Sequence, residues 1–168
     1  LGVGRTFQIT ATFPSMTVRE NVQVPLISYN AQLFNMWRST PGFERDEANR
    51  LLDLVGMSGY AERPCGELAY GDLKRLELAI ALANQPKLLL MDEPTAGMGP
   101  AETSRTAQLI LGLGDSRTVL VIDHDMSFVE QLAAPVTVMH QGKFLKQGSV
   151  AEVRADPEVA AVYLGHTA

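Results

Sequence analysis

The sequence predicts an α/β fold in which a parallel sheet is interrupted by an inserted block of helices. Two short, almost continuous apolar runs, at 87–92 and 118–123, are typical of strands buried on both faces. The segment between them, 100–113, begins with a proline and has apolar residues at helical spacing. Strand, helix and strand in this order form the βαβ pattern of a parallel sheet.

The helical block lies in the first half of the chain, after a predicted strand at 3–8. Thr17 and Glu20 have the spacing of a capping box, which predicts a helix to about residue 28. We expect a loop or frayed helix at 28–42. Apolar residues at helical spacing then predict two further helices, at 44–55 and 71–84.

The C-terminal part is predicted to hold a short helix, a hairpin and two small helices. The helix is expected at 127–133, and the hairpin strands at 136–140 and 144–147. A capping box and an Asp-Pro step mark the starts of the two last helices: Ser149 with Glu152, and Asp156 with Pro157.

The composition indicates a chain that folds around a core. The 168 residues are 46% hydrophobic and 20% charged. A net charge of −5 disfavours a protein that coats nucleic acid, and the single Cys65 excludes an internal disulfide. Since the apolar runs are too short to cross a bilayer, we expect no transmembrane segment. The acidic net charge leads us to expect no nucleic-acid partner.

Two strands of the predicted sheet end in residues that suit phosphate chemistry. Asp92 and Glu93 end the first, where the first acid suits Mg²⁺ and the second suits polarisation of a water. His124 follows the second, between Asp123 and Asp125. The alternatives are that the acids only solvate a loop, or that the Asp-His-Asp triplet binds a metal. The triplet is disfavoured because neighbouring strand residues point to opposite faces.

A glycine-bearing turn at 68–75 leads into the helix at 71–84, where backbone N–H groups would attract an anion. Together these features resemble the ATP-binding cassette (ABC) ATPases. In that resemblance, 4–8 matches the glutamine loop, 68–72 the signature, 88–93 the Walker B strand and 96–99 the loop that follows it. His124 matches the switch histidine.

The chain resembles in particular the ATPase subunits of branched-chain amino acid importers, of the LivG type. This similarity lies at 5–8, 16–22, 76–79 and 162–165, and 138–142 is also similar to the urea and amide branch. The resemblance implies a partial P-loop NTPase (RecA-like) core with an inserted helical subdomain. Its parts would be a core strand with the glutamine loop (1–10), the helical subdomain (11–85), the α/β core (86–148) and the C-terminal helices (149–168).

The resemblance also implies the role of each site residue, with ATP and Mg²⁺ as cofactors. Asp92 and Gln8 would hold Mg²⁺, Glu93 would be the general base and His124 would contact the γ-phosphate. The remaining nucleotide-binding positions would be Leu68, Ala69, Tyr70, Gly71, Asp72 and Gly97. The signature would act on ATP held by a second, head-to-tail ATPase subunit. Membrane permease subunits would be the other partners, at the cytoplasmic face of the bacterial inner membrane.

Three departures from the family pattern stand out. Ala69 replaces the usual signature serine, and Gly99 replaces an aspartate of the wider superfamily. The sequence also holds no G-x-x-x-x-G-K-[ST] phosphate loop, which in the family precedes the glutamine loop. We therefore expect an N-terminally truncated subunit, inactive by itself, because it lacks the lysine and the amide groups that hold the phosphates.

Three alternatives stand beside an importer of branched-chain or related amino acids. The first is the ATPase of a urea or amide importer. The second is a truncated fragment that docks on a membrane subunit without catalysis. The third, a DNA-repair or chromosome-organising ATPase, is disfavoured because no sustained heptads lie between Gln8 and Leu68.

Overall fold

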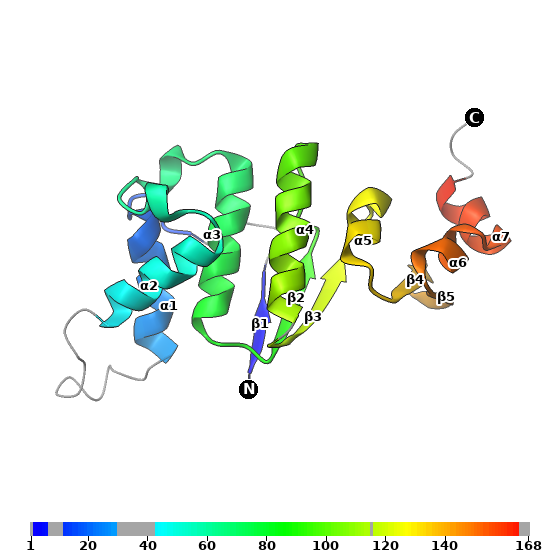
Figure 1. The fold of residues 1–168 in the computed structure, drawn as a ribbon, viewed down its shortest axis with the longest axis horizontal. Helices are drawn as coiled ribbons and strands as arrows, with labels where there is room; N and C mark the ends of the chain where they lie inside the picture. The colour runs from blue at the N-terminus through cyan, green and yellow to red at the C-terminus, as the bar shows by residue number, and fades with distance from the viewer. Residues whose placement is uncertain (1, 7–11, 30–42, 115, 165–168) are drawn as a thin grey trace. The chain divides into compact units, whose positions relative to one another are not determined.

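The computed structural model describes residues 2–6, 12–29, 43–114 and 116–164. The chain forms two compact units, Leu1–Ile122 and Asp123–Ala168. Figure 1 shows their elements. Within the described ranges, no helix combines the length and the apolar character needed to cross a membrane.

The first unit is built on a parallel sheet of three strands. Its order is β1 (Val3–Arg5), β2 (Leu88–Asp92) and β3 (Thr118–Ile122), and helix α4 (Pro100–Gly114) connects the last two. The predicted βαβ pattern is therefore confirmed. Since β2 lies in the middle of the sheet, its carboxyl end lies between β1 and β3.

Helices α3 (Tyr70–Ala83) and α4 pack against one face of this sheet (Figure 1). Leu89 and Met91 of β2 are buried. Helix α3 approaches β1 so closely that a Cβ on Gly4 would lie 3.2 Å from the carbonyl oxygen of Ala81. On the opposite face, Leu120 and Ile122 are 54% and 61% exposed, so the prediction that β3 is buried on both faces is wrong within the described residues.

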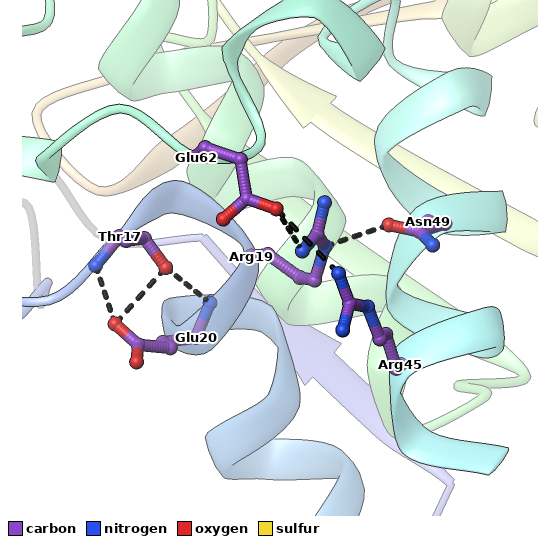
Figure 2. Close-up of polar contacts among 6 residues, drawn as sticks. All are labelled: Thr17, Arg19, Glu20, Arg45, Asn49 and Glu62. Carbon is purple, nitrogen blue, oxygen red and sulfur yellow. Dashed lines mark hydrogen bonds and ion pairs between the residues drawn. The ribbon is translucent and has the colours of Figure 1, made fainter. Parts of the chain in front are cut away.

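The helices predicted in the first half of the chain are present, as α1 (Val18–Tyr29) and α2 (Phe43–Leu54), followed by two short 3-10 turns, η2 (Ser58–Tyr60) and η3 (Cys65–Glu67). Most of the predicted loop or frayed helix at 28–42 lies outside the described residues. The capping box of α1 is formed: the backbone N–H of Thr17 donates to Oε2 of Glu20 at 2.7 Å (Figure 2). The packing between the block's helices is apolar, and its fully buried residues include Val18, Val22, Ala48 and Leu52.

Polar contacts then join the block's parts (Figure 2). Arg19 of α1 donates to Oδ1 of Asn49 in α2 at 2.8 Å and pairs with Glu62 in the loop after η2. Arg45 of α2 lies 3.6 Å from the same Glu62 carboxylate. One carboxylate thus draws two arginines together and ties both helices to the loop that leads toward residue 68.

The second unit contains α5 (Met126–Leu132) and a hairpin of β4 (Val136–His140) and β5 (Lys143–Gly148). The sequence predicts a hairpin with a three-residue turn, but the turn has two residues, because Gln141 and Gly142 both have positive φ, 49° and 74°. That is the geometry of a type I′ turn, which lets Lys143 pair with His140.

Three short helical segments follow: α6 (Val150–Arg154), α7 (Pro157–Val159) and η4 (Ala160–Leu164). The predicted capping box of Ser149 and Glu152 is present in full. Pro157 occupies the start of α7, and Asp156 caps it by accepting from the N–H groups of Glu158 and Val159 at 3.0 and 3.3 Å.

Candidate functional site

The two carboxylates singled out by the sequence lie at the carboxyl end of β2. Asp92 is its last residue and is aligned with Ile122 of β3. Glu93 follows, and its backbone N–H donates to the carbonyl oxygen of Ile122 at 2.8 Å. Both acidic residues are half-buried. Since open α/β sheets bind ligands at the carboxyl ends of their strands, these acids lie where a ligand would be expected.

The backbone of Glu93 is left-handed, with a φ of 46°. Such a conformation is uncommon for a residue with a Cβ and is concentrated at functional sites. It turns the chain out of the strand, so that the N–H of Ala96 donates back to the carbonyl oxygen of Glu93 at 3.2 Å. Asp92 therefore keeps strand geometry, whereas Glu93 is held by a turn.

The predicted anion-binding turn, 68–75, overlaps the start of α3. Ala69 is its N-cap, has extended φ and ψ of −66° and 158°, and supplies no side-chain cap. Asp72 pairs with Arg75, which also donates to the carbonyl oxygen of Gly56, just past α2, at 3.2 Å. The first N–H groups of a helix have no acceptor within the helix, so the start of α3 suits an anion.

Tyr70 of this turn lies against Gly97 in the loop after Glu93. Gly97 has a φ of 74°, and a Cβ there would lie only 3.0 Å from Cδ1 and 3.2 Å from Cε1 of Tyr70. Lys74 places its Nζ 5.5 Å from the centroid of the Tyr70 ring and pairs with Glu77 at 3.1 Å. The first turn of α3 thus contacts the loop that follows the two carboxylates.

A second contact joins the same two segments. Glu102, in the first turn of α4, accepts a hydrogen bond from the N–H of Gly99 at 3.1 Å. A Cβ on Gly71 would lie 3.2 Å from Oε1 and 3.5 Å from Oε2 of the same carboxylate. Sequence reasoning missed Glu102, because a glycine at the N-cap lacks the hydroxyl or carboxylate that signals a capping box.

In the second unit, His124 precedes α5, and its side chain is 75% exposed. The neighbouring aspartates have local roles. Oδ1 of Asp123 accepts from the N–H of Asp125 at 2.9 Å, and Asp125 caps α5 by accepting from the N–H groups of Ser127 and Phe128 at 2.8 and 3.2 Å. Both aspartates therefore accept local backbone hydrogen bonds.

The donor set fits a metal ion that arrives with a phosphate ligand. In the part of the chain that the structure describes, no three His, Cys, Asp or Glu side chains are grouped to hold a metal ion. Asp92 offers one half-buried carboxylate at the sheet edge. Mg²⁺ is commonly held by one or two carboxylates together with substrate phosphates. Gln8, the other predicted ligand, lies outside the described residues.

Comparisons with known proteins agree on one family, the ABC transporters. The ABC transporter family profile matches residues 2–96. The chain is 38% identical to the high-affinity branched-chain amino acid transport ATP-binding protein LivG of Salmonella typhimurium and of Escherichia coli K12, covering 98% of this chain and 68% of each relative. It is 36% identical to BraF of Pseudomonas aeruginosa, with the same coverage.

Solved structures agree with the observed fold. The ADP conformation of MJ1267, an ATP-binding cassette of an ABC transporter, is similar with a TM-score of 0.82 and 29% identity, over 98% of this chain and 69% of that one. A nucleotide-free ATP-binding cassette from an ABC transporter gives a TM-score of 0.80 and 28% identity, over 96% and 68%. The predicted P-loop NTPase fold is therefore confirmed.

Proposed function

The chain belongs to the ABC transporter family, and from this premise we propose that it is the ATP-hydrolysing subunit of an importer for branched-chain or related amino acids. The observation that supports this most is the carboxyl end of β2, where Asp92 and Glu93 are half-buried next to the loop that contacts the start of α3. The names of LivG and BraF support the solute class.

In this proposal the two acids divide the work by their geometry. Asp92, which keeps the strand direction, would hold Mg²⁺ together with Gln8. The ion would supply neutralising charge for the β- and γ-phosphates. Glu93 would accept a proton from the water that attacks the γ-phosphorus, and ADP leaves as the bond to its β-phosphate oxygen breaks. His124 would contact the γ-phosphate.

The start of α3 would act on a nucleotide held by a second ATPase subunit. Because Ala69 has no hydroxyl, backbone N–H groups would carry this contact, with the helix dipole adding to the attraction. The positions involved would be Leu68, Ala69, Tyr70, Gly71 and Asp72, with Gly97 in the adjoining loop. Two subunits arranged head to tail would then enclose two ATP molecules.

The other partners in this proposal are membrane permease subunits, at the cytoplasmic face of the membrane. The helical block, 11–85, would be the subdomain that lies between the permease and the core. Its ties through Glu62 would let it move as one piece with the loop toward residue 68. The other parts would be the core strand with the glutamine loop (1–10), the α/β core (86–148) and the C-terminal helices (149–168).

The test is transport by the assembled complex. The subunit is completed with a phosphate-loop segment, tagged, purified with its permease and binding-protein partners, and reconstituted in vesicles with ATP on its own side. We expect ATP-dependent uptake of leucine, isoleucine or valine that is lost with Glu93→Gln. Uptake of urea in place of these amino acids would overturn the proposed solute. Uptake that does not depend on ATP would overturn the proposed activity.

A further inference from the structure

We propose that Glu102 is a positioning residue, which fastens the start of α3 to the loop behind Asp92 and Glu93 so that the signature turn is held ready for the partner subunit's ATP. The inference rests on the proposed function, since it assigns a task within ATP hydrolysis. Glu102 has no place in the nucleotide contacts described above. Its carboxylate instead links two segments of the chain that do.

The link has two points of contact, and we call it the signature brace, formed by Tyr70, Gly71, Gly97, Gly99 and Glu102. At the first point the Tyr70 ring lies against Gly97, where a Cβ would be only 3.0 Å from the ring. At the second, the Glu102 carboxylate accepts from the Gly99 N–H at 3.1 Å and fills the space beside Gly71.

The two helix starts therefore lie side by side at the brace. A hollow between them is lined from both, by Gly71, Arg75, Met98, Glu102, Arg105 and Thr106. The N–H of Met98 also donates to the carbonyl oxygen of Thr95 at 3.0 Å, which holds the loop after Glu93 in a turn. A shift of that loop would reach α3 through these contacts, because packed elements transmit displacements to one another.

Two other glutamates show why Glu102 is special. Glu20 and Glu152 also accept the N–H of an N-cap residue, Thr17 and Ser149, each at 2.7 Å. In both of those boxes the N-cap hydroxyl accepts a hydrogen bond from the backbone N–H of the glutamate. Glu102 has a glycine as its N-cap, and its carboxylate reaches the first turn of another helix. Capping alone would not require that reach.

The experiment compares Glu102→Ala with Glu152→Ala in the assembled, reconstituted transporter. Both variants lose a capping glutamate, so we expect similar small decreases in Tm. Only Glu102→Ala should lower kcat, by roughly tenfold, a typical size for coupling between sites. The nucleotide Kd, measured with a fluorescent ATP analogue, should stay within about twofold of the parent, because the contacts of the chain's own ATP are intact.

Glu102→Gln supplies the conservative variant. It keeps the size of the side chain and an oxygen that accepts from Gly99, so kcat should stay within about twofold of the parent. Glu102→Asp withdraws the carboxylate by one methylene and should lower kcat, which keeps the proposal testable where Glu102→Ala does not assemble. Equal losses in Glu102→Gln and Glu102→Ala would overturn positioning, as would a kcat of Glu102→Ala equal to that of Glu152→Ala.

The proposed ATPase activity and the signature brace can fail separately. A parent transporter without ATP hydrolysis would overturn the proposed function and the signature brace with it. A parent that hydrolyses ATP and is inactivated by Glu93→Gln, yet is indifferent to Glu102→Ala, would overturn the brace alone. A Tyr70→Ala, Glu102→Ala double variant adds a check. Its loss in kcat should be smaller than the product of the single losses, and multiplicative losses would contradict a shared role.

Discussion

The backbone N–H of Glu93 donates to the carbonyl oxygen of Ile122 at 2.8 Å, one residue beyond the last aligned pair of β2 and β3. This bond fixes Glu93 to the neighbouring strand while its φ of 46° turns the chain away from the sheet. The carboxylates of Asp92 and Glu93 are therefore adjacent in sequence but held by different local geometries. That difference suits the two tasks proposed for them, metal binding and proton transfer.

The contact between Gly97 and Tyr70 predicts a stability difference between two glycine substitutions. Gly97→Ala should lower the free energy of unfolding by roughly 1–3 kcal/mol, because a Cβ is strained at a φ of 74° and meets the Tyr70 ring. Gly112 lies within α4, where an added Cβ would meet no atom within 4 Å. Gly112→Ala should therefore raise the free energy of unfolding by about 0.5–1 kcal/mol. Urea denaturation measures both, and equal effects would contradict the description of Gly97.

The two faces of the sheet predict unequal costs for the same truncation. Leu89 is fully buried, so Leu89→Ala should cost roughly 2–5 kcal/mol of unfolding free energy. Leu120 lies on the neighbouring strand and is 54% exposed, so Leu120→Ala should cost less than about 1 kcal/mol. Chemical denaturation at constant pH compares the two. A cost at Leu120 as large as that at Leu89 would show that its face is packed in the folded protein.

The capping box of α6 predicts a pH dependence. The N–H of Ser149, and then its hydroxyl, donate to Glu152 and hold the pKa of that carboxyl below its usual range. As pH falls, Glu152 is protonated in the unfolded chain before it is protonated in the folded chain. The stabilisation that this carboxylate gives is therefore complete above the unfolded pKa of about 4.3 and is lost below the folded pKa. The stability difference between parent and Glu152→Gln should therefore shrink between about pH 6 and pH 3. A constant difference would contradict this.

His124 allows catalysis to be separated from stability. Its side chain is 75% exposed, so His124→Ala should change the unfolding free energy by less than about 0.5 kcal/mol. If it contacts the γ-phosphate, kcat should fall by roughly 10²-fold with nucleotide binding retained. His140→Ala, at the exposed end of β4, is the matched control and should leave kcat near that of the parent. Similar kcat values in both variants would remove His124 from the site.

Local signals predicted the elements well, and contacts between distant segments were beyond them. The capping boxes of Thr17 and of Ser149 were correct because each is complete within four residues. Arg19, in contrast, bonds Asn49 and Glu62, which are 30 and 43 positions away. No periodicity encodes such pairs, since they depend on how α1 and α2 pack.

The candidate site divides in the same way. The position of Asp92 and Glu93 followed from the buried strand before them, and the structure confirms it at the carboxyl end of β2. The contact of Glu102 with Gly71 depends on the approach of two helices that are distant in sequence. The left-handed backbone of Glu93 was also missed, because glutamate has no preference for that conformation and tertiary contacts must impose it.

The central claim is that Glu93 is the general base of an ATP-hydrolysing subunit, and one measurement tests it most directly. The rate of phosphate release from ATP is compared between the assembled transporter and its Glu93→Gln variant, with Glu130→Gln in α5 as a matched control. Glutamine keeps the size of the side chain but cannot accept the proton. We expect Glu93→Gln to lower kcat by roughly 10²–10⁴-fold while ATP still binds, and the control to match the parent. Undiminished phosphate release by Glu93→Gln would contradict the account.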